Sequence, residues 1–358
     1  MFKRIYLLPL IAMLLNSCSL FEFDVEIDAN NPFIKYTGRI EFLDSANVKL
    51  SWSGVSIETL FEGTTISIKL VDGNNDYNVF IDDKLDTVLV TKKDTVYTLA
   101  KNLTDTLHHI LITKRTEASL GEVIFSGFII NHDKNFYYPD KIKKRNIEFI
   151  GDSFVAGFGV EGLSPECLFE RETENNYLAF GPILARRFNA EYFVEAISGS
   201  GIIRNFGDSL SASLYPFPYY YDRINIFDTT KWDFSNWIPD AVIIRIGNND
   251  FWSKPYPTRS QFEKAYKEFI LMLRMKYANT NLFCLSGAEE QDPDSEYINN
   301  VVDDLRINNR DKNIHFVKLD VKLNRPDDFG CQYHPNINGQ KKIADFLEPI
   351  IREKMNWK

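Results

Sequence analysis

Apolar and polar residues alternate over the first third of the chain, between about residues 33 and 130. Four runs with a period of two lie at residues 65–70, 77–81, 107–113 and 123–129. Turn-forming residues separate these runs, as in Asp72-Gly73-Asn74-Asn75. Short alternating segments with turns between them and no helical period predict an antiparallel sandwich or jelly roll, and about 100 residues suit one such domain.

The pattern changes after about residue 140. Five short apolar runs follow, at residues 147–150, 192–197, 241–246, 282–285 and 314–319. Helical segments separate them. Continuous apolar strands that alternate with helices predict a parallel sheet covered on both faces. We therefore expect an all-β domain over residues 33–139 and a three-layer α/β/α domain with a five-stranded parallel sheet over residues 140–358.

Three segments of the second domain have the helical period. Ser260-Gln261-Phe262-Glu263 has the spacing of a capping box, and apolar residues recur on one face after it. Residues 343–351 have the spacing of an amphipathic closing helix, which Pro349 must strain or kink. Pro182 weakens the helical pattern of residues 177–188.

The first residues have the pattern of an export signal. Lys3 and Arg4 precede an apolar run at residues 5–15, which is too short to span a bilayer as a mature helix. Leu15-Asn16-Ser17-Cys18 resembles the bacterial lipobox, in which the cysteine is lipidated and becomes the first residue of the mature chain. An ordinary cleaved signal with an incidental cysteine is the alternative.

On this interpretation, residues 1–17 are a lipoprotein signal peptide and residues 18–32 are a tether. We expect an exported bacterial lipoprotein of the cell envelope, either periplasmic or at the outer surface. Its only attachment to the membrane would be the lipid on Cys18.

Composition narrows the function classes further. The chain has 41 Lys and Arg against 50 Asp and Glu and no basic block, which argues against nucleic acid as a partner. Four cysteines without a Cys-x-x-Cys spacing do not make a disulfide-rich scaffold or a zinc ribbon. We predict no metal site, because the remaining candidate ligands have no ligand spacing, namely His108, His109, His132 and His315.

Residues that carry chemistry follow the predicted parallel strands. They occur in Gly151-Asp152-Ser153, Ser198-Gly199-Ser200-Gly201, Gly247-Asn248-Asn249-Asp250 and Tyr333-His334-Pro335-Asn336. In open parallel sheets, ligands bind beyond the carboxyl ends of the strands. One edge of the sheet is therefore expected to offer a serine, a glycine amide, an asparagine amide and a histidine. These are the parts of an acyl-transfer site: a nucleophile, a general base and oxyanion donors.

These four blocks, in this order over about 200 residues, resemble the SGNH (GDSL-like) hydrolase superfamily. Within it the chain is similar to carbohydrate esterase family 2, which joins an N-terminal jelly roll to this hydrolase domain. Further similar motifs are Tyr36-Thr37-Gly38-Arg39, Lys114-Arg115-Thr116-Glu117, Arg204-Asn205 and Gly330-Cys331. The resemblance implies a flavodoxin-like hydrolase domain and the removal of acetyl groups from plant polysaccharides such as xylan and glucomannan.

The resemblance also implies a role for each site residue. Ser153 attacks the acetyl carbonyl, and His334 takes its proton. The Ser153 and Gly199 amides and the Asn249 side chain form the oxyanion hole, in which each donor is typically worth ~3 kcal/mol. Gly201 is the alternative donor if the turn runs two residues later. No cofactor is expected, because the acyl-enzyme route uses only side chains and water.

One position departs from the superfamily pattern. The usual aspartate three residues before the histidine is replaced by Cys331, and a neutral thiol cannot supply a carboxylate charge. The resemblance to family 2 implies a Ser–His dyad in which a backbone carbonyl accepts the other N–H of the imidazole. Asp327 or Asp328 as the orienting group is the alternative.

Cys167 and Cys331 both lie in loops expected near the site, in an exported and oxidising context. A disulfide between them is one hypothesis, and two free thiols are the other. Cys284 lies in an apolar strand and is expected to be a small buried residue. Trp252 and Tyr333 flank the asparagine and histidine blocks, where they form either a platform for a sugar ring or ordinary cleft wall.

The function predicted from these features is a serine esterase that removes O-acetyl groups from polysaccharides or oligosaccharides. Within enzymes, the alternative is an acyltransferase or a lipolytic esterase on the same catalytic residues. From another class, the alternative is a glycan-binding lipoprotein with a decayed hydrolase domain, for which the replaced aspartate is the only support.

Overall fold

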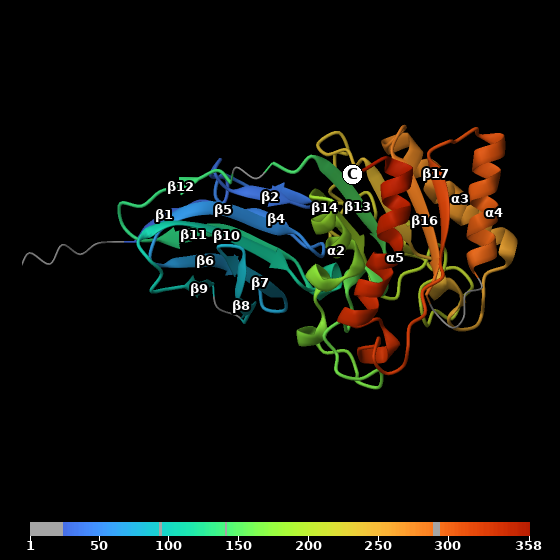
Figure 1. Ribbon diagram of the computed structural model, residues 1–358, viewed down its shortest axis with the longest axis horizontal. Helices are drawn as coiled ribbons and strands as arrows, with labels where there is room; N and C mark the ends of the chain where they lie inside the picture. Colours follow the sequence, from blue (N-terminus) through green and yellow to red (C-terminus); the bar gives the residue numbers. More distant parts are fainter. Residues whose placement is uncertain (1–23, 93–94, 140–141, 289–293) are drawn as a thin grey trace, which may run out of the picture.

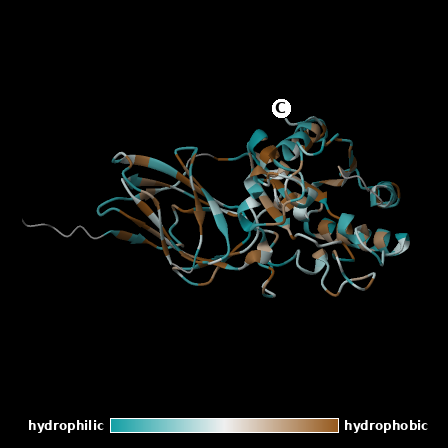
Figure 2. Cartoon of the chain, turned by 90° about the horizontal axis from the view of Figure 1, so that it is seen from below, coloured by the Kyte–Doolittle hydropathy of each residue, from teal (hydrophilic) through white to brown (hydrophobic). Residues whose placement is uncertain are grey.

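The computed structural model describes residues 24–92, 95–139, 142–288 and 294–358. The predicted signal peptide and Cys18 lie outside these residues. The chain forms two parts side by side, a β-sandwich followed by an α/β domain (Figure 1). Hydrophobic residues concentrate along the strands of both parts (Figure 2).

In the described residues, the sandwich consists of two antiparallel sheets of six strands each. One sheet contains β1 (Val25–Ile27), β3 (Ile40–Phe42), β4 (Val48–Leu50), β6 (Ile66–Val71), β9 (Val96–Ala100) and β11 (Val123–Ile130). The other contains β2 (Lys35–Thr37), β5 (Ser56–Gly63), β7 (Asp76–Ile81), β8 (Lys84–Val90), β10 (Thr106–Lys114) and β12 (Phe136–Tyr137). Alternate residues of β6 are buried, as the period of two predicts. The predicted all-β sandwich is confirmed.

Part of the predicted tether belongs to the sandwich. A tether over residues 18–32 is wrong from β1 onward, because Val25–Ile27 pairs antiparallel with residues 128–130 of β11. Gly127 allows this approach, since a Cβ atom at that position would lie 1.9 Å from the carbonyl oxygen of Ile27. The three residues Val25–Ile27 have acidic and asparagine neighbours and are too few to show the period of a strand, so no sign of β1 appears in the sequence. Main-chain pairing to an available strand edge does not depend on that period.

Within residues 142–288 and 294–358, five parallel strands form the sheet of the α/β domain. They are β13 (Arg145–Gly151), β14 (Ala190–Ala196), β15 (Ala241–Arg245), β16 (Asn281–Gly287) and β17 (Ile314–Leu319). Their order in the sheet is β14-β13-β15-β16-β17, which is the flavodoxin-like arrangement. Each predicted apolar run overlaps one of these strands, and two of the runs extend one residue beyond β14 and β15. The predicted parallel sheet is confirmed. The connection order reverses between β13 and β15, where ligands bind in such folds.

Helices cover both faces of this sheet (Figure 1). The α-helices are α1 (Ser153–Ala156), α2 (Phe180–Arg187), α3 (Arg259–Lys276), α4 (Asp294–Asn308) and α5 (Ile337–Met355). The 3-10 helices are η1 (Ala118–Leu120), η2 (Arg171–Thr173), η3 (Asn176–Leu178), η4 (Phe217–Tyr219), η5 (Asn248–Phe251) and η6 (Cys331–Tyr333). Ile243 of β15 packs in the core with α2 and α5, whereas Ile244 packs in the core with α3 and α4. Among the described helices, none is both long and apolar enough to cross a bilayer.

The helix ends differ in detail from their prediction. The capping box of α3 is formed by Thr258 and Gln261, not by Ser260 and Glu263. The Thr258 side chain accepts a hydrogen bond from the Gln261 backbone, and the Gln261 side chain accepts one from the Thr258 backbone at 2.8 Å. Thr-x-x-Gln has the same spacing as Ser-x-x-Glu and lies two residues earlier. Pro182 lies in the first turn of α2, where an N–H has no acceptor within the helix.

A buried ion-pair cluster joins the two parts. Arg39 of the sandwich is fully buried and lies 3.0 Å from Glu148 of β13 and 3.0 Å from Glu195 of β14. Its guanidinium also donates to the Tyr221 carbonyl. Burial raises the pKa of Glu195 well above its ordinary value. Because removing one partner would leave a buried charge unpaired, we expect its loss to weaken the contact between the sandwich and the parallel sheet.

Candidate active site

Ser153 and His334 meet at the carboxyl edge of the parallel sheet, although 181 residues separate them. Ser153 begins α1 directly after β13, and His334 follows η6. The Oγ atom of Ser153 lies 2.8 Å from Nε2 of His334, and Nδ1 of His334 lies 3.0 Å from the carbonyl oxygen of Gln332. A carbonyl oxygen only accepts, so Nδ1 carries the hydrogen and Nε2 accepts the hydroxyl hydrogen of Ser153. This is the geometry of a nucleophile and its general base.

The imidazole of His334 packs between aromatic rings. Its centroid lies 4.4 Å from that of Phe158 and 6.3 Å from that of Phe154. Burial lowers the pKa of His334 to about 4, and the nearby positive charge of Arg245 acts in the same direction. The ring is therefore neutral at neutral pH, which is the protonation state that a general base requires.

Neither aspartate of the preceding loop orients the histidine. The Asp328 carboxylate accepts the Asn324 N–H at 2.7 Å and pairs with Lys342 at 2.6 Å. The Asp327 side chain is exposed. Nδ1 of His334 instead donates to the Gln332 carbonyl at 3.0 Å. The orienting group is thus a main-chain carbonyl.

The loop that carries Gln332 is held at several points. Cys331 and Cys167 form a disulfide across 164 residues of sequence, which makes them partners and not free thiols. The N–H of Gln332 donates to the Cys167 carbonyl at 3.0 Å, and the N–H of Tyr333 donates to the Pro165 carbonyl at 3.1 Å. Gln332 and Tyr333 both have positive φ angles, of 51° and 58°. Tertiary contacts must stabilise two consecutive left-handed residues that are not glycine.

The predicted oxyanion amides lie on the loops after β13 and β14. Within the described residues, the N–H groups of Ser153 and Gly199 donate to no protein acceptor. Gly199 has a φ angle of +74°, which favours glycine. The N–H of Gly201 donates to the Asn205 side chain at 3.2 Å, so it is already satisfied. The geometry therefore favours Gly199 over Gly201 as the donor.

Asn249 lies in η5, which begins three residues after the end of β15. Its Nδ2 atom donates to the Ser200 carbonyl at 2.9 Å and lies 3.3 Å from the Asp152 carboxylate. These contacts place the amide between the loops that carry Ser153 and Gly199. To donate to a substrate oxygen, Nδ2 must move away from either the Ser200 carbonyl or the Asp152 carboxylate.

Asp152 and Asp250 hold these loops in place. Asp152 caps α1 by accepting the Phe154 N–H at 3.1 Å, and it pairs with Arg245 at 3.2 Å. The Asp250 carboxylate accepts three consecutive backbone N–H groups, at 2.9, 2.8 and 2.8 Å, from residues 202–204. Burial raises the pKa of both carboxyl groups. Both aspartates act on the shape of the site and contact neither Ser153 Oγ nor the His334 ring in the described hydrogen bonds.

The two aromatic residues predicted as a sugar platform are exposed. Trp252 is 55% exposed and Tyr333 is 43% exposed. The guanidinium of Arg325 lies 4.6 Å from the ring centroid of Tyr333, so a cation lies over this ring. Both side chains have surface available to a ligand, and their role as a platform stays a prediction.

Several residues of the site carried no signal of their own in the sequence. Phe158 buries the histidine, Arg245 pairs with Asp152, and Glu117 contacts the turn before Gly199. Lys114-Arg115-Thr116-Glu117 appears among the motifs of the resemblance, but a charged run after a strand is typical of a solvated turn. The resemblance to family 2 included this motif but implied no contact for Glu117.

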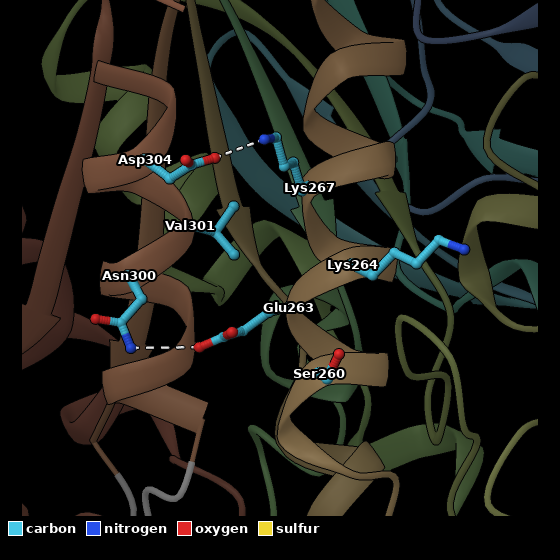
Figure 3. Close-up of a pocket in the computed structure, with 7 residues that line it drawn as sticks. All are labelled: Ser260, Glu263, Lys264, Lys267, Asn300, Val301 and Asp304. Atoms are coloured by element: carbon cyan, nitrogen blue, oxygen red, sulfur yellow. Dashed lines mark hydrogen bonds and ion pairs between the residues drawn. The ribbon is translucent and has the colours of Figure 1, made fainter. Parts of the chain in front are cut away.

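A separate hollow of about 310 Å³ lies between α3 and α4, outside the four blocks of the site (Figure 3). Its lining residues are Ser260, Glu263, Lys264, Lys267, Asn300, Val301 and Asp304. Lys267 pairs with Asp304 at 2.6 Å, and Asn300 donates to Glu263 at 3.3 Å. These polar groups satisfy one another, so we assign the hollow no function. Within the described residues, no group of three His, Cys, Asp or Glu side chains is arranged to hold a metal ion.

A flavodoxin-like sheet with a serine and a histidine joined at its carboxyl edge defines a serine hydrolase. Residues 149–342 match the GDSL-like lipase/acylhydrolase family, and residues 36–139 match the carbohydrate esterase 2 N-terminal family. The chain therefore belongs to the GDSL-like hydrolases and, within them, to carbohydrate esterase family 2. The predicted family is confirmed.

Named relatives agree with this assignment. The chain is 33% identical over 339 residues to the cellulase/esterase CelE of Acetivibrio thermocellus, a match that covers 92% of this chain but only 40% of CelE. It is 29% identical to an acetylxylan esterase/glucomannan deacetylase of Cellvibrio japonicus, over 97% of this chain and 98% of that protein. A structure of a family two carbohydrate esterase from Clostridium thermocellum in complex with cellohexaose has a TM-score of 0.85 and 31% identity, over 91% of this chain and 100% of that one.

Proposed function

We propose that the protein is a serine esterase that removes O-acetyl groups from polysaccharides or oligosaccharides of the xylan or glucomannan type. The observation that carries this proposal is the 2.8 Å contact between Ser153 Oγ and His334 Nε2, with the other ring nitrogen held by the Gln332 carbonyl. The acetylxylan esterase/glucomannan deacetylase of Cellvibrio japonicus, similar along nearly its whole length, supports an acetyl ester as the substrate.

In the acylation step, Ser153 Oγ attacks the acetyl carbonyl carbon while His334 Nε2 accepts the hydroxyl proton. The tetrahedral oxyanion accepts hydrogen bonds from the N–H groups of Ser153 and Gly199. The Asn249 amide becomes a third donor when its side chain rotates toward the oxyanion. The bond to the sugar oxygen then breaks, and the imidazolium returns the proton to that oxygen. The products are a free sugar hydroxyl and an acetyl-serine.

In the deacylation step, His334 removes a proton from water as the water attacks the acetyl-serine. Collapse of the second tetrahedral intermediate releases acetate and restores the Ser153 hydroxyl. In both steps the Gln332 carbonyl keeps the hydrogen of the ring on Nδ1 and stabilises the transient imidazolium by its dipole. A full negative charge on the orienting group is absent from this scheme.

The intact Ser–His contact favours an enzyme over a decayed glycan-binding protein. A decayed site retains no constraint on the Ser153 to His334 distance, whereas here the loop of the histidine is fixed by a disulfide and main-chain hydrogen bonds. Hydrolysis is favoured over acyl transfer because it needs only water as the second substrate. The proposed partner is therefore an acetylated glycan.

We extend the proposal to the cell envelope, with a lipid on Cys18 as the only membrane attachment. The positive residues Lys3 and Arg4, the short apolar run and the lipobox-like Leu15-Asn16-Ser17-Cys18 support it. Expression in a bacterial host with radiolabelled palmitate tests it. We expect label in the wild type and none in Cys18→Ala, and an unlabelled wild type would overturn the anchor.

Acetate release from acetylated xylan, glucomannan and pectin tests the activity. We expect release from xylan or glucomannan by the wild type and none above background by Ser153→Ala. Ser164→Ala is a matched control, because in the described hydrogen bonds the Ser164 hydroxyl contacts only the Glu166 carboxylate and the Glu166 N–H. Equal acetate release by the wild type and Ser153→Ala would overturn the proposed function.

A further inference from the structure

One side chain of the sandwich reaches the turn that carries Gly199. Glu117 lies between β10 and η1, and its Oε2 atom accepts the backbone N–H of Ser198 at 2.7 Å. Ser198 directly precedes Gly199, whose own N–H is unpaired among the described residues. Glu117 is only 4% exposed. A buried carboxylate of the first domain is thus one residue away from the expected oxyanion donor of the second.

Hydrogen bonds hold the backbone of Glu117 at both its N–H and its carbonyl. Its N–H donates to the Glu174 carboxylate at 3.0 Å, and its carbonyl accepts from Lys114 Nζ at 3.0 Å. Lys114 is fully buried and also donates to the Thr116 carbonyl at 2.7 Å. Its positive charge offsets part of the cost of burying the two carboxylates. Glu117 is therefore a fixed acceptor and not a mobile surface side chain.

The turn from Ile197 to Gly199 depends on few other contacts. Ile197 donates to the Gly151 carbonyl at 3.1 Å, which ties the turn to the end of β13. Ser200 donates to the Ile197 carbonyl at 3.2 Å, and the Gly199 carbonyl accepts from Phe206 at 2.7 Å. Within the described hydrogen bonds, Glu117 is the only acceptor of the Ser198 N–H. Loss of this acceptor would leave a partly buried N–H unsatisfied at the residue that sets the direction of the next amide.

We propose that Glu117 is a positioning residue for the oxyanion hole, and that it aims the Gly199 N–H at the ester carbonyl by holding the Ser198 N–H. This inference rests on the esterase function proposed above. Glu117 touches neither substrate nor reacting atoms, so it acts only through Ser198. The sandwich then takes part in catalysis in the hydrolase domain, beyond packing against it.

A purely structural role at the domain interface is the competing explanation. It predicts that changes at Glu117 lower stability and leave kcat intact wherever the protein is folded. A positioning role predicts a loss of kcat with little change in KM, because the oxyanion develops only in the transition state. A measurement of kcat and KM at a temperature well below Tm therefore distinguishes the two explanations.

The experiment compares Glu117→Ala, Glu117→Asp and Glu117→Gln in the full chain, with p-nitrophenyl acetate as substrate. We expect kcat to fall about 10- to 100-fold in Glu117→Ala, less than the loss of a complete oxyanion donor, with KM within about threefold. Glu117→Asp keeps the charge near Lys114 but withdraws the carboxylate, and we expect a similar loss of kcat. Glu117→Gln keeps a carbonyl oxygen for the Ser198 N–H and should restore most of the rate.

Glu191→Gln is the matched control, because Glu191 pairs with Lys35 across the same domain boundary at 2.5 Å and, among the described residues, forms no side-chain hydrogen bond or ion pair with Ser153, Gly199, Asn249 or His334. We expect it to change Tm and not kcat. A boronic acid that forms a tetrahedral adduct on Ser153 should lose affinity for Glu117→Ala in parallel with kcat/KM.

Two results overturn the inference. A wild-type kcat in folded Glu117→Ala would do so, and if that variant does not fold, a wild-type kcat in Glu117→Asp would do the same. A wild-type protein without turnover would instead overturn the proposed function, and this inference with it.

Discussion

Nδ1 of His334 donates its hydrogen to the carbonyl oxygen of Gln332, only two residues earlier in the chain, at 3.0 Å. This bond selects the tautomer in which Nε2 faces Ser153 as an acceptor. In a Ser-His-Asp triad a carboxylate accepts the Nδ1 hydrogen and adds a full negative charge. Here the residue at the usual aspartate position, Cys331, is instead part of a disulfide that holds the loop.

The low pKa of His334 predicts an enzyme that stays active in acid. A histidine must be neutral to act as a base, and its pKa is lowered to about 4 by burial. We therefore expect kcat/KM on a neutral acetyl ester to be flat from about pH 7 to pH 5 and to fall about tenfold per pH unit below pH 4. A pH profile with thermal melts at each pH tests this. A fall in kcat/KM with its midpoint near pH 6.5 would show that the His334 ring is not buried in the free enzyme.

The two aspartates before the histidine should be dispensable for chemistry. Asp327 is exposed, and Asp328 bonds the Asn324 N–H and Lys342 instead of the imidazole. We expect Asp327→Asn and Asp328→Asn each to lower kcat by less than about tenfold, with a lower Tm for the second. Steady-state kinetics on both variants decide the point. A loss of about 10⁴ in either would reveal a true triad.

The disulfide should contribute more to stability than to the chemical step. It closes a segment of 164 residues, whereas the hydrogen bonds from Gln332 and Tyr333 to the 165–167 loop do not require it. We expect Cys167→Ser/Cys331→Ser to lose roughly 2–4 kcal/mol of unfolding free energy and less than about tenfold in kcat below its Tm. Denaturant unfolding and kinetics measure the two effects. Cys284→Ser, at the buried free cysteine, separates loss of the bridge from loss of a sulfur atom.

Asn249 should act on kcat more than on KM. Its amide lies between the loops of Ser153 and Gly199, where charge develops on the substrate oxygen. We expect Asn249→Ala to lower kcat by about 10²–10³, the usual effect of removing one oxyanion donor. Asn299→Ala on α4 is the control, since Asn299 contacts only Asp303 in the described side-chain hydrogen bonds. An unchanged kcat in folded Asn249→Ala would remove this residue from the oxyanion hole.

Much of the fold followed from local patterns. The period of two in residues 65–70 and the apolar run at residues 314–319 both fell in strands, since burial on one face or two leaves a direct trace in the sequence. The strand Val25–Ile27 left no such trace, because a partner strand 100 residues away supplies its pairing. The cap of α3 was misplaced by two residues because Thr258 and Ser260 both have an acceptor of the right kind three residues later.

Residue types and their order along the chain were enough to predict the composition of the site. Ser153, Gly199, Asn249 and His334 each follow a strand or close a loop at one edge, and parallel strands bring such ends together whatever the rest of the chain does. The folded chain sets which carbonyl orients His334, which glycine amide is free, and which sandwich side chain holds Ser198. Every residue carries a carbonyl and nearly every one an N–H, so these choices depend on which distant segments pack within 3 Å of each other and not on residue type.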